Sequence, residues 1–320
     1  MNWTIIFALL ALAGPIVIAA SAKRRPEEKE QPAGVQAGYL ALVLGGFGLL
    51  AQFMSFSAVM LVFVLVTGVV TGLNRWLLVK RRAADSIEPH YVEYAKSFFP
   101  VILAVFVLRS FLVEPFQIPS SSMRPGLVVG DFILVNKFTY GIRVPVLNTV
   151  LLPVNKVERG DVVVFNFPLD PNVNFIKRVI GLPGDKVEYR DKRLTINGKA
   201  VPAEASGTYS YTEKGNKLVH TDQLTETLGE RSYTTLNEDT KPSLFVAAVS
   251  PFEHKDQCQY TESGMVCTVP AGQYLTMGDN RDNSHDGRYW GFVDDKLLVG
   301  KAFFVWMNLS TPSRIGHSIR

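Results

Sequence analysis

The stretch Gln117-Ile118-Pro119-Ser120-Ser121-Ser122-Met123-Arg124-Pro125 divides this chain of 320 residues into two kinds of sequence. The run before it, from Phe98 to Val113, is apolar enough to lie in a membrane. After it, short β-branched and aromatic runs alternate with turn residues. Three consecutive serines thus stand a few residues from an expected membrane surface. Because that is an unusual place for a hydroxyl cluster, we predict that one of these serines is a nucleophile.

The composition separates the chain into two halves. Residues 1–114 contain long uncharged runs, whereas the remainder is more polar and long enough to bury a core of its own. The net charge of +4 is weak support for nucleic-acid binding, and we expect no nucleic-acid partner. The basic residues cluster beside apolar runs, where they indicate membrane topology.

Four apolar runs predict four transmembrane helices. Their expected bounds are Trp3–Ala20, about Ala37 to Leu50 or Ala51, about Ser57 to Leu73, and Phe98–Val113, with a turn near residues 52–55. One span needs roughly 20 residues, so the uncharged region from Ala33 to Leu73 is long enough for two. The first run is not a typical cleavable signal peptide, because its basic residues follow the apolar segment and none precedes it.

Two basic clusters, at residues 23–25 and 75–82, set the predicted orientation. Basic loops tend to stay in the cytoplasm. If residues 33–73 cross the membrane twice, both clusters face inward, whereas a single crossing would place one of them outside. The four-pass arrangement therefore delivers Glu114 and everything after it to the outer face.

The second half reads as mainly antiparallel β structure. Strand-like runs cover residues 132–135, 161–165, 175–180 and 186–189, and Ile196-Asn197-Gly198-Lys199 has the pattern of a two-residue hairpin. No segment shows convincing amphipathic helical periodicity. The predicted fold class is a mainly antiparallel β domain outside the cytoplasm, preceded by α-helical transmembrane segments.

Lys177 lies in the strand-like run Phe175–Ile180. Strand alternation places it on the same face as Phe175 and Val179. A lysine on an apolar face is either a charged residue that keeps an edge strand from pairing with another chain, or a buried amine. Burial would lower its pKa, and a neutral amine could take a proton from a serine. The spacing alone leaves both alternatives open.

Residues 277–291 are dense in turn formers and charged side chains. They could form a solvated loop held by Asp–Arg pairs. His285 could belong to a Ser-His-Asp triad, although the nearby acids lie very close in sequence for that arrangement. Asp279, Asp282 and Asp286 could instead bind a cation, but the order of residues is not that of an EF-hand and the neighbouring arginines would compete with the ion.

Two cysteines, Cys258 and Cys267, fit no zinc-ligand spacing. They are either free thiols or, if this half lies outside the cytoplasm, a disulfide across a hairpin. His220 and His254 are expected at the surface rather than as ligands. We predict no metal site and no organic cofactor.

Several stretches together resemble bacterial type I signal peptidase, also called leader peptidase. The matching stretches are Pro119–Pro125, Arg159-Gly160-Asp161, Phe175–Arg178, Gly181–Asp185 and Gly278–Gly291. The resemblance covers about residues 97–200 and 266–310. Better-known members have two spans, so four is a departure, but an even number of spans keeps the site on the same side.

The resemblance implies a Ser-Lys dyad, with Ser122 as nucleophile and Lys177 as general base. Ser120 would add its hydroxyl to the backbone N–H of Ser122 in an oxyanion hole, and Ser284 would hydrogen-bond and orient the lysine. Ser121 stands where glycine is frequent. The supporting ion pairs that the resemblance implies are Asp279 with Arg178 and Asp286 with Arg288. His285 has no role in this scheme.

The resemblance also implies a substrate and a location. The enzyme would remove N-terminal signal peptides at Ala-x-Ala sites from preproteins exported by the secretion machinery. The substrate would bind as an added strand against shallow apolar pockets. Their expected lining is Phe116, Ile118, Met123, Leu127, Ile133, Val164, Phe175 and Ile176. Trp290, Phe303, Phe304, Val305 and Trp306 would either contact membrane lipid or belong to the core.

The implied location is the bacterial cytoplasmic (inner) membrane, with several passes and the catalytic domain on the outer, periplasmic face. The expected division is a membrane region at 1–96 with three helices and cytoplasmic loops, a fourth helix at 97–114, a catalytic β domain at 115–200 and 267–320, and an inserted β-rich subdomain at 201–266. Two rivals are a self-cleaving Ser-Lys repressor-type protein, which the membrane half disfavours, and a membrane-anchored scaffold without catalysis, which the intact Ser122, Lys177 and Ser284 disfavour.

Overall fold

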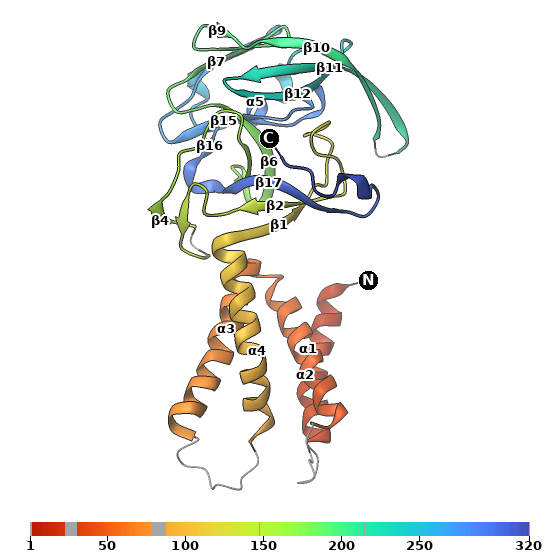
Figure 1. The fold of residues 1–320 in the computed structure, drawn as a ribbon, viewed down its shortest axis with the longest axis vertical. Helices are drawn as coiled ribbons and strands as arrows, with labels where there is room; N and C mark the ends of the chain where they lie inside the picture. The colour runs from red at the N-terminus through yellow and green to blue at the C-terminus, as the bar shows by residue number, and fades with distance from the viewer. Residues whose placement is uncertain (1, 23–30, 79–87, 147, 214, 320) are drawn as a thin grey trace. The chain divides into compact units, whose positions relative to one another are not determined.

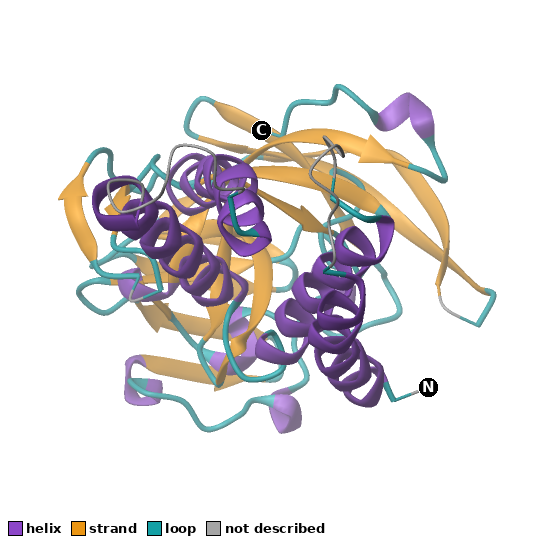
Figure 2. Ribbon diagram, turned by 90° about the horizontal axis from the view of Figure 1, so that it is seen from below, coloured by secondary structure: helices purple, strands orange, loops and turns teal. Residues whose placement is uncertain are grey.

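The computed structural model describes residues 2–22, 31–78, 88–146, 148–213 and 215–319. The chain forms two compact units, Met1–Ser110 and Phe111–Arg320. Figure 1 follows the chain from end to end, and Figure 2 shows that long helices form the first unit and strands most of the second.

The first unit contains four long helices. They are α1 (Trp3–Ser21), α2 (Ala33–Leu50), α3 (Phe56–Leu73) and α4 (His90–Val107), and the π-helical turns η1 (Asn74–Leu78) and η3 (Leu108–Leu112) extend the last two. All four are long and apolar enough to cross a membrane. Three lie close to the predicted bounds. Helix α4 begins eight residues before Phe98, because its first two turns are polar and apolarity marks only the later part of the helix.

Helices α1 and α2 pack closely through glycines of α2. A Cβ atom on Gly45 would lie 2.3 Å from the backbone nitrogen of Ala11, and one on Gly48 would lie 2.3 Å from the Phe7 ring. Small residues allow this approach of two backbones in a membrane. The guanidinium of Arg109 lies 3.7 Å from the centroid of the Phe56 ring, so this charged residue of η3 has an aromatic partner. The basic cluster 23–25 and residues 79–82 of the second cluster lie outside the described residues.

The second unit is built on a seven-stranded sheet with the order β1-β2-β17-β5-β6-β15-β16. Its strands are β1 (Val113–Gln117), β2 (Asp131–Asn136), β5 (Val162–Phe167), β6 (Asp170–Gly181), β15 (Gln273–Met277), β16 (Val293–Asp294) and β17 (Leu298–Asn308). All of its strand pairs are antiparallel, which confirms the predicted fold class. The predicted strands at 132–135, 161–165 and 175–180 are β2, β5 and β6.

Three smaller sheets complete the unit. One has the order β13-β14-β7-β8-β9, with β7 (Lys186–Arg190), β8 (Arg193–Ile196), β9 (Lys199–Ala200), β13 (Cys258–Thr261) and β14 (Gly264–Thr268). The others are β3 (Gly141–Arg143) with β4 (Val150–Pro153), and β10 (Ala203–Glu213), β11 (Lys217–Leu228) and β12 (Arg231–Asn237). Strands β8 and β9 form the predicted hairpin, with positive φ at Asn197 and Gly198 as a type I′ turn requires. Short helical turns are α5 (Gly287–Trp290), η4 (Val246–Ala248), η5 (Lys255–Gln257), η6 (Arg281–Asn283), η7 (Asp295–Leu297) and η8 (Pro312–Arg314).

The region expected as an insertion has two parts in the structure. Residues 203–237 form the separate sheet β10-β11-β12, which we call the inserted sheet. Strands β13 and β14 instead join β7 in the five-stranded sheet. Cys258 and Cys267 are opposite each other in the β13–β14 pair and are disulfide-bonded.

Candidate active site

The serine stretch forms a tight turn after β1, which we call the serine loop (residues 118–127). Its ends are held by backbone hydrogen bonds: the Ile118 N–H donates to the Asp131 carbonyl at 2.8 Å, and the Leu127 N–H donates to the Met123 carbonyl at 2.9 Å. Ser122 is only 7% exposed, whereas Ser120 is exposed. Ser121 is also buried, at 5% exposed, so the loop turns Ser121 and Ser122 away from solvent and leaves Ser120 accessible.

Lys177 meets that serine from the central strand β6. Its Nζ lies 2.7 Å from Ser122 Oγ and donates to the Ile176 carbonyl at 2.9 Å. The lysine is 4% exposed, so it is a buried amine and not a charged residue that protects an edge strand. Two residues 55 apart in sequence are thus brought into hydrogen-bonding contact.

Burial is the main reason that the pKa of Lys177 is lowered, to about 8. The carboxylates of Asp286 and Asp279 raise this pKa and partly oppose burial, and Arg288 lowers it further. A lysine of this kind is partly neutral near neutral pH. Its unprotonated amine can accept the proton of a hydroxyl at hydrogen-bonding distance.

The other two predicted serines occupy different positions. Ser120 Oγ lies 3.3 Å from Ser122 Oγ, on the exposed side of the pair. The hydrogen bond expected between Ser284 and Lys177 does not form. Ser284 Oγ is buried without a hydrogen-bond partner among the described residues. It lies against Gly278, where a Cβ atom would come within 2.2 Å of it.

Both predicted ion pairs are formed, and both are buried. Arg178 Nε and Nη2 donate to the two carboxylate oxygens of Asp279 at 2.8 and 2.7 Å. Arg288 makes the same bidentate contact with Asp286, donating from Nε at 2.8 Å and from Nη2 at 2.9 Å. Burial would raise the pKa of Asp286, but Arg288 and the Gly278 N–H hold it below its ordinary value. These pairs supply the carboxylates whose charge acts on Lys177.

The other two interpretations of residues 277–291 are wrong. Each acidic residue of the suggested cation site has a basic partner: Asp279 and Asp286 have the arginines just described, and Asp282 has Lys192 at 2.8 Å. The described part of the chain holds no cluster of three or more His, Cys, Asp or Glu arranged for a metal ion. The exposed His285 ring stacks on Tyr289 at 5.6 Å between centroids, and the base that contacts Ser122 Oγ is Lys177. His220 and His254 are exposed, as expected.

Seven of the eight expected pocket residues belong to one apolar cluster beside the serine loop. They are Phe116, Ile118, Met123, Leu127, Ile133, Val164 and Ile176. Phe175 packs in a second cluster, stacked on Phe167 at 4.3 Å and close to Trp290. Most of these side chains are buried, so they form a wall rather than an open cavity.

The five residues expected either to contact lipid or to belong to the core divide between core and surface. Trp290 and Val305 are buried core residues. Phe303 and Trp306 are 38% and 37% exposed, and Phe304 is partly exposed. The expectation of lipid contact therefore stays open only for these last three residues.

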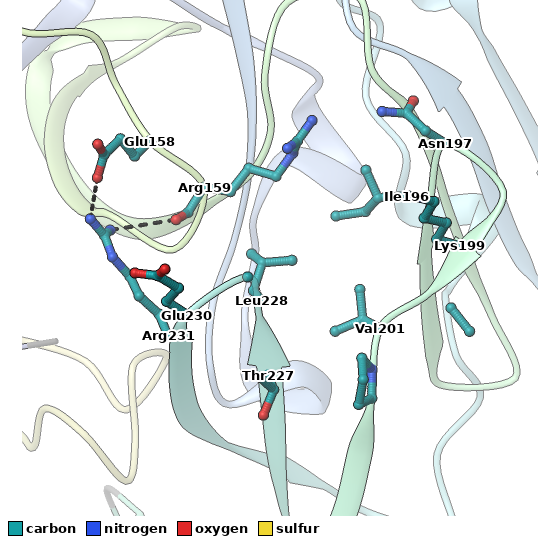
Figure 3. Close-up of a pocket in the computed structure, with 13 residues that line it drawn as sticks. Glu158, Arg159, Ile196, Asn197, Lys199, Val201, Thr227, Leu228, Glu230 and Arg231 are labelled. Atoms are coloured by element: carbon teal, nitrogen blue, oxygen red, sulfur yellow. Dashed lines mark hydrogen bonds and ion pairs between the residues drawn. The ribbon is translucent and has the colours of Figure 1, made fainter.

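A cavity of about 700 Å³ lies elsewhere in the domain. It is formed by the turn at Glu158–Arg159, the β8–β9 hairpin and the turn between β11 and β12 (Figure 3). Arg231 lines it and donates to Glu158 and to the Arg159 carbonyl. None of the predicted site residues lines this cavity.

The sequence interpretation missed three residues, Asn280, Tyr211 and Glu226, that contact the serine loop or the segment after β15. Asn280 donates its backbone N–H to the Ser122 carbonyl, and its side chain contacts Tyr211. Glu226 forms a buried pair with Arg281 at 2.6 Å. Asn280 lay within a stretch already noted for its chemistry, but nothing local in the sequence distinguishes Tyr211 or Glu226.

Comparisons with known proteins place these features in a family. A family model described as signal peptidase, peptidase S26, matches residues 91–307. A signal peptidase I of Pseudomonas aeruginosa is 48% identical over 236 residues, covering 70% of this chain and 75% of that protein. One of Haemophilus influenzae is 30% identical over 312 residues, covering 80% and 86%. A solved signal peptidase I of Enterococcus faecalis V583 is 28% identical and covers 46% of this chain and 97% of that chain, with a TM-score of 0.25.

Proposed function

The chain belongs to the signal peptidase family, peptidase S26, and from that premise we propose that it is a membrane-bound serine endopeptidase that cleaves signal peptides from exported preproteins. One observation carries the proposal: the buried Lys177 amine lies 2.7 Å from Ser122 Oγ. A serine hydroxyl is a weak nucleophile until a base takes its proton. The lowered pKa of Lys177 makes that base available near pH 8.

The proposed reaction proceeds in two halves. In the first, Ser122 Oγ attacks the scissile carbonyl carbon while its proton passes to the neutral Lys177 amine. The tetrahedral intermediate collapses when the resulting ammonium gives that proton to the leaving amine, which departs as the new N-terminus. In the second, water attacks the acyl-enzyme, Lys177 takes a proton from the water, and Ser122 recovers a proton as the signal peptide leaves with a carboxylate.

The oxyanion of each intermediate needs hydrogen-bond donors placed in advance. The backbone N–H of Ser122 and the hydroxyl of Ser120 are the proposed donors. The exposed position of Ser120, 3.3 Å from Ser122 Oγ, supports this assignment. Ion pairs Arg178–Asp279 and Asp286–Arg288 are proposed as fixed supports of the lysine.

The proposed substrate binds as an extra strand along β6. Strand β15 pairs with β6 only from Arg178 onward, so Asp170–Lys177 have no strand partner on that side among the described strands. An extended peptide can hydrogen-bond to such an edge. The buried apolar wall beside Ser122 leaves little depth for side chains, which supports a preference for small residues such as alanine at Ala-x-Ala sites.

The four apolar helices support a membrane anchor, and we propose four passes through the bacterial cytoplasmic membrane. The predicted domain division belongs to this proposal, with residues 115–200 and 267–320 as catalytic domain on the periplasmic face. Reporter fusions after Arg82 should give a cytoplasmic signal, and fusions after residue 115 a periplasmic one. A periplasmic signal after Arg82 would refute four passes.

The function itself is tested with purified full-length protein in detergent and a preprotein carrying an Ala-x-Ala site. Ser122→Ala and Lys177→Met should each abolish cleavage, and Ser206→Ala, an exposed serine on β10, should cleave like the wild type. Sequencing of the new N-terminus identifies the cleaved bond. Wild-type rates in either dyad variant would show that another group attacks the substrate.

A further inference from the structure

The inserted sheet contacts the active site through one hydroxyl group. Tyr211 is a buried residue of β10. Its hydroxyl oxygen accepts two hydrogen bonds, from Asn280 Nδ2 at 2.8 Å and from Asn283 Nδ2 at 3.0 Å. Both asparagines lie in the segment that follows β15. A residue of the inserted sheet therefore holds two side chains of the segment that follows β15.

Asn280 connects that hydroxyl to the nucleophile. Its side-chain Nδ2 also donates to the Ser121 carbonyl at 3.1 Å, and its backbone N–H donates to the Ser122 carbonyl at 3.0 Å. The Ser121 carbonyl and the Ser122 N–H belong to the same planar peptide group. Asn280 thus fixes the orientation of the N–H that is proposed to stabilise the oxyanion.

The Tyr211 hydroxyl determines how the Asn280 amide is turned. An amide has two N–H donors on one side and an acceptor oxygen on the other. With Tyr211 and Ser121 both accepting, the two donors are used. If the Tyr211 acceptor is lost, one buried donor is left without a partner, and a flipped amide would set its oxygen against the Ser121 carbonyl oxygen.

Further hydrogen bonds join the inserted sheet to the segment after β15 and to the serine loop. Arg281 donates to Glu226 on β11 through both terminal nitrogens, at 2.8 and 2.6 Å, and both side chains are buried. The Leu236 N–H on β12 donates to the Asp279 carbonyl at 2.9 Å. On the serine loop itself, Arg124 Nη1 donates to the Tyr209 hydroxyl at 2.9 Å. The contact at Tyr211 is therefore part of a fixed arrangement.

We propose that Tyr211 is a positioning residue of the peptidase, which orients the Ser122 peptide through Asn280 and makes the inserted sheet part of the catalytic machinery. This inference rests on the proposed Ser-Lys function. It assigns a role to the region between residues 203 and 237, for which the sequence suggested none.

Tyr211→Phe separates this role from packing. Tyr211 also packs with Val219 and Leu236, and phenylalanine keeps that ring contact while removing the acceptor. Loss of a complete oxyanion donor lowers kcat by about 100- to 1,000-fold, and a misdirected donor should cost less, about 10-fold or more. The KM for the preprotein should stay within about twofold, because the β6 edge and the apolar wall are untouched.

The experiment measures kcat, KM, the pH profile and the thermal unfolding midpoint of full-length Tyr211→Phe in detergent. We expect a lower plateau of kcat with its midpoint still near pH 8, because the surroundings of Lys177 are unchanged. Tyr260→Phe is the matched control, since the Tyr260 hydroxyl is buried without a hydrogen-bond partner in the described part of the chain. It should match the wild type in kcat and KM.

Two results would overturn the inference. One is wild-type kcat in Tyr211→Phe. The other is a joint loss of kcat, substrate affinity and thermal stability, which would indicate packing alone. Asn280→Asp gives a second test, because it removes the donors to Ser121 and Tyr211 and should lower kcat at least as much. If Ser122→Ala is inactive while both variants cleave normally, the dyad stands and only this inference fails.

Discussion

Replacing Lys177 with methionine should abolish cleavage and at the same time stabilise the β domain at neutral pH. In the unfolded chain the lysine has its ordinary pKa of 10.5, whereas in the folded domain burial lowers it to about 8. Below pH 8 the folded protein therefore holds an ammonium in an apolar site. The difference between the two pKa values corresponds to about 3 kcal/mol of lost stability.

Methionine removes that cost but also removes two hydrogen bonds. The Nζ contacts with Ser122 Oγ and with the Ile176 carbonyl are lost, which costs about 1–2 kcal/mol in total. The net gain for Lys177→Met at pH 7 is therefore about 1–2 kcal/mol. For a domain of this size that raises the unfolding midpoint by about 2–8 °C.

The pH dependence of this gain has a definite sign. Between the folded and unfolded pKa values the unfolded lysine binds a proton that the folded one does not, so wild-type stability rises by about 1.4 kcal/mol for each pH unit from 8 to 10.5. Methionine does not titrate. The advantage of the variant should shrink above pH 8 and vanish near pH 9. By pH 10 the variant should be less stable than the wild type, because mainly the lost hydrogen bonds remain.

The assay is thermal unfolding of the full-length proteins in detergent at pH 7, 8.5 and 10, followed by near-ultraviolet circular dichroism of the packed aromatic residues. Lys186→Met, at an exposed position on β7, should follow the wild type at each pH. A Lys177→Met variant that is less stable than the wild type by the same amount at all three pH values would refute the reasoning.

Three further predictions use other features of the site. The logarithm of kcat should rise with a slope of about one below pH 7 and level off above pH 9, as the pKa of Lys177 near 8 requires, and a flat profile would contradict the lysine base. Gly278→Ala places a Cβ 2.6 Å from the carbonyl oxygen of Ser122 and should lower kcat at least about tenfold, whereas Gly126→Ala, with its nearest contact at 3.7 Å, should not. Labelling of the unfolded, unreduced protein should find neither Cys258 nor Cys267 reactive, and reduction should expose both.

The four long helices could be predicted because each is a long apolar run, and apolarity can be read directly from the sequence. Three of the four have nearly the predicted bounds, and α4 departs where its first turns are polar. Four strands, β2, β5, β6 and β7, and the β8–β9 hairpin were recognisable from β-branched runs and turns. Their order was not, because β17 inserts between β2 and β5 from the far end of the sequence.

A site residue could be predicted where neighbouring residues in the sequence mark it. It could not be predicted where its role depends on a contact with a distant part of the chain. Strand alternation placed Lys177 on an apolar face, but only the fold shows that this face is buried. The expected bond from Ser284 fails because its hydroxyl packs against Gly278, a contact no spacing rule describes. Tyr211 lies 69 residues from its partner Asn280, and such a pairing depends on the path of the five strands between them, β11 to β15.

The position of the 700 Å³ cavity bears on how this enzyme could be inhibited by a small molecule. A compound filling that space would contact neither Ser122 nor Lys177, because the cavity lining includes no residue of the serine loop and not Lys177. Beside Ser122 the apolar wall is closed, whereas Asp170–Lys177 of β6 have no strand partner on the β15 side among the described strands. An effective inhibitor should therefore have an extended, strand-like backbone and carry an electrophile within reach of Ser122 Oγ.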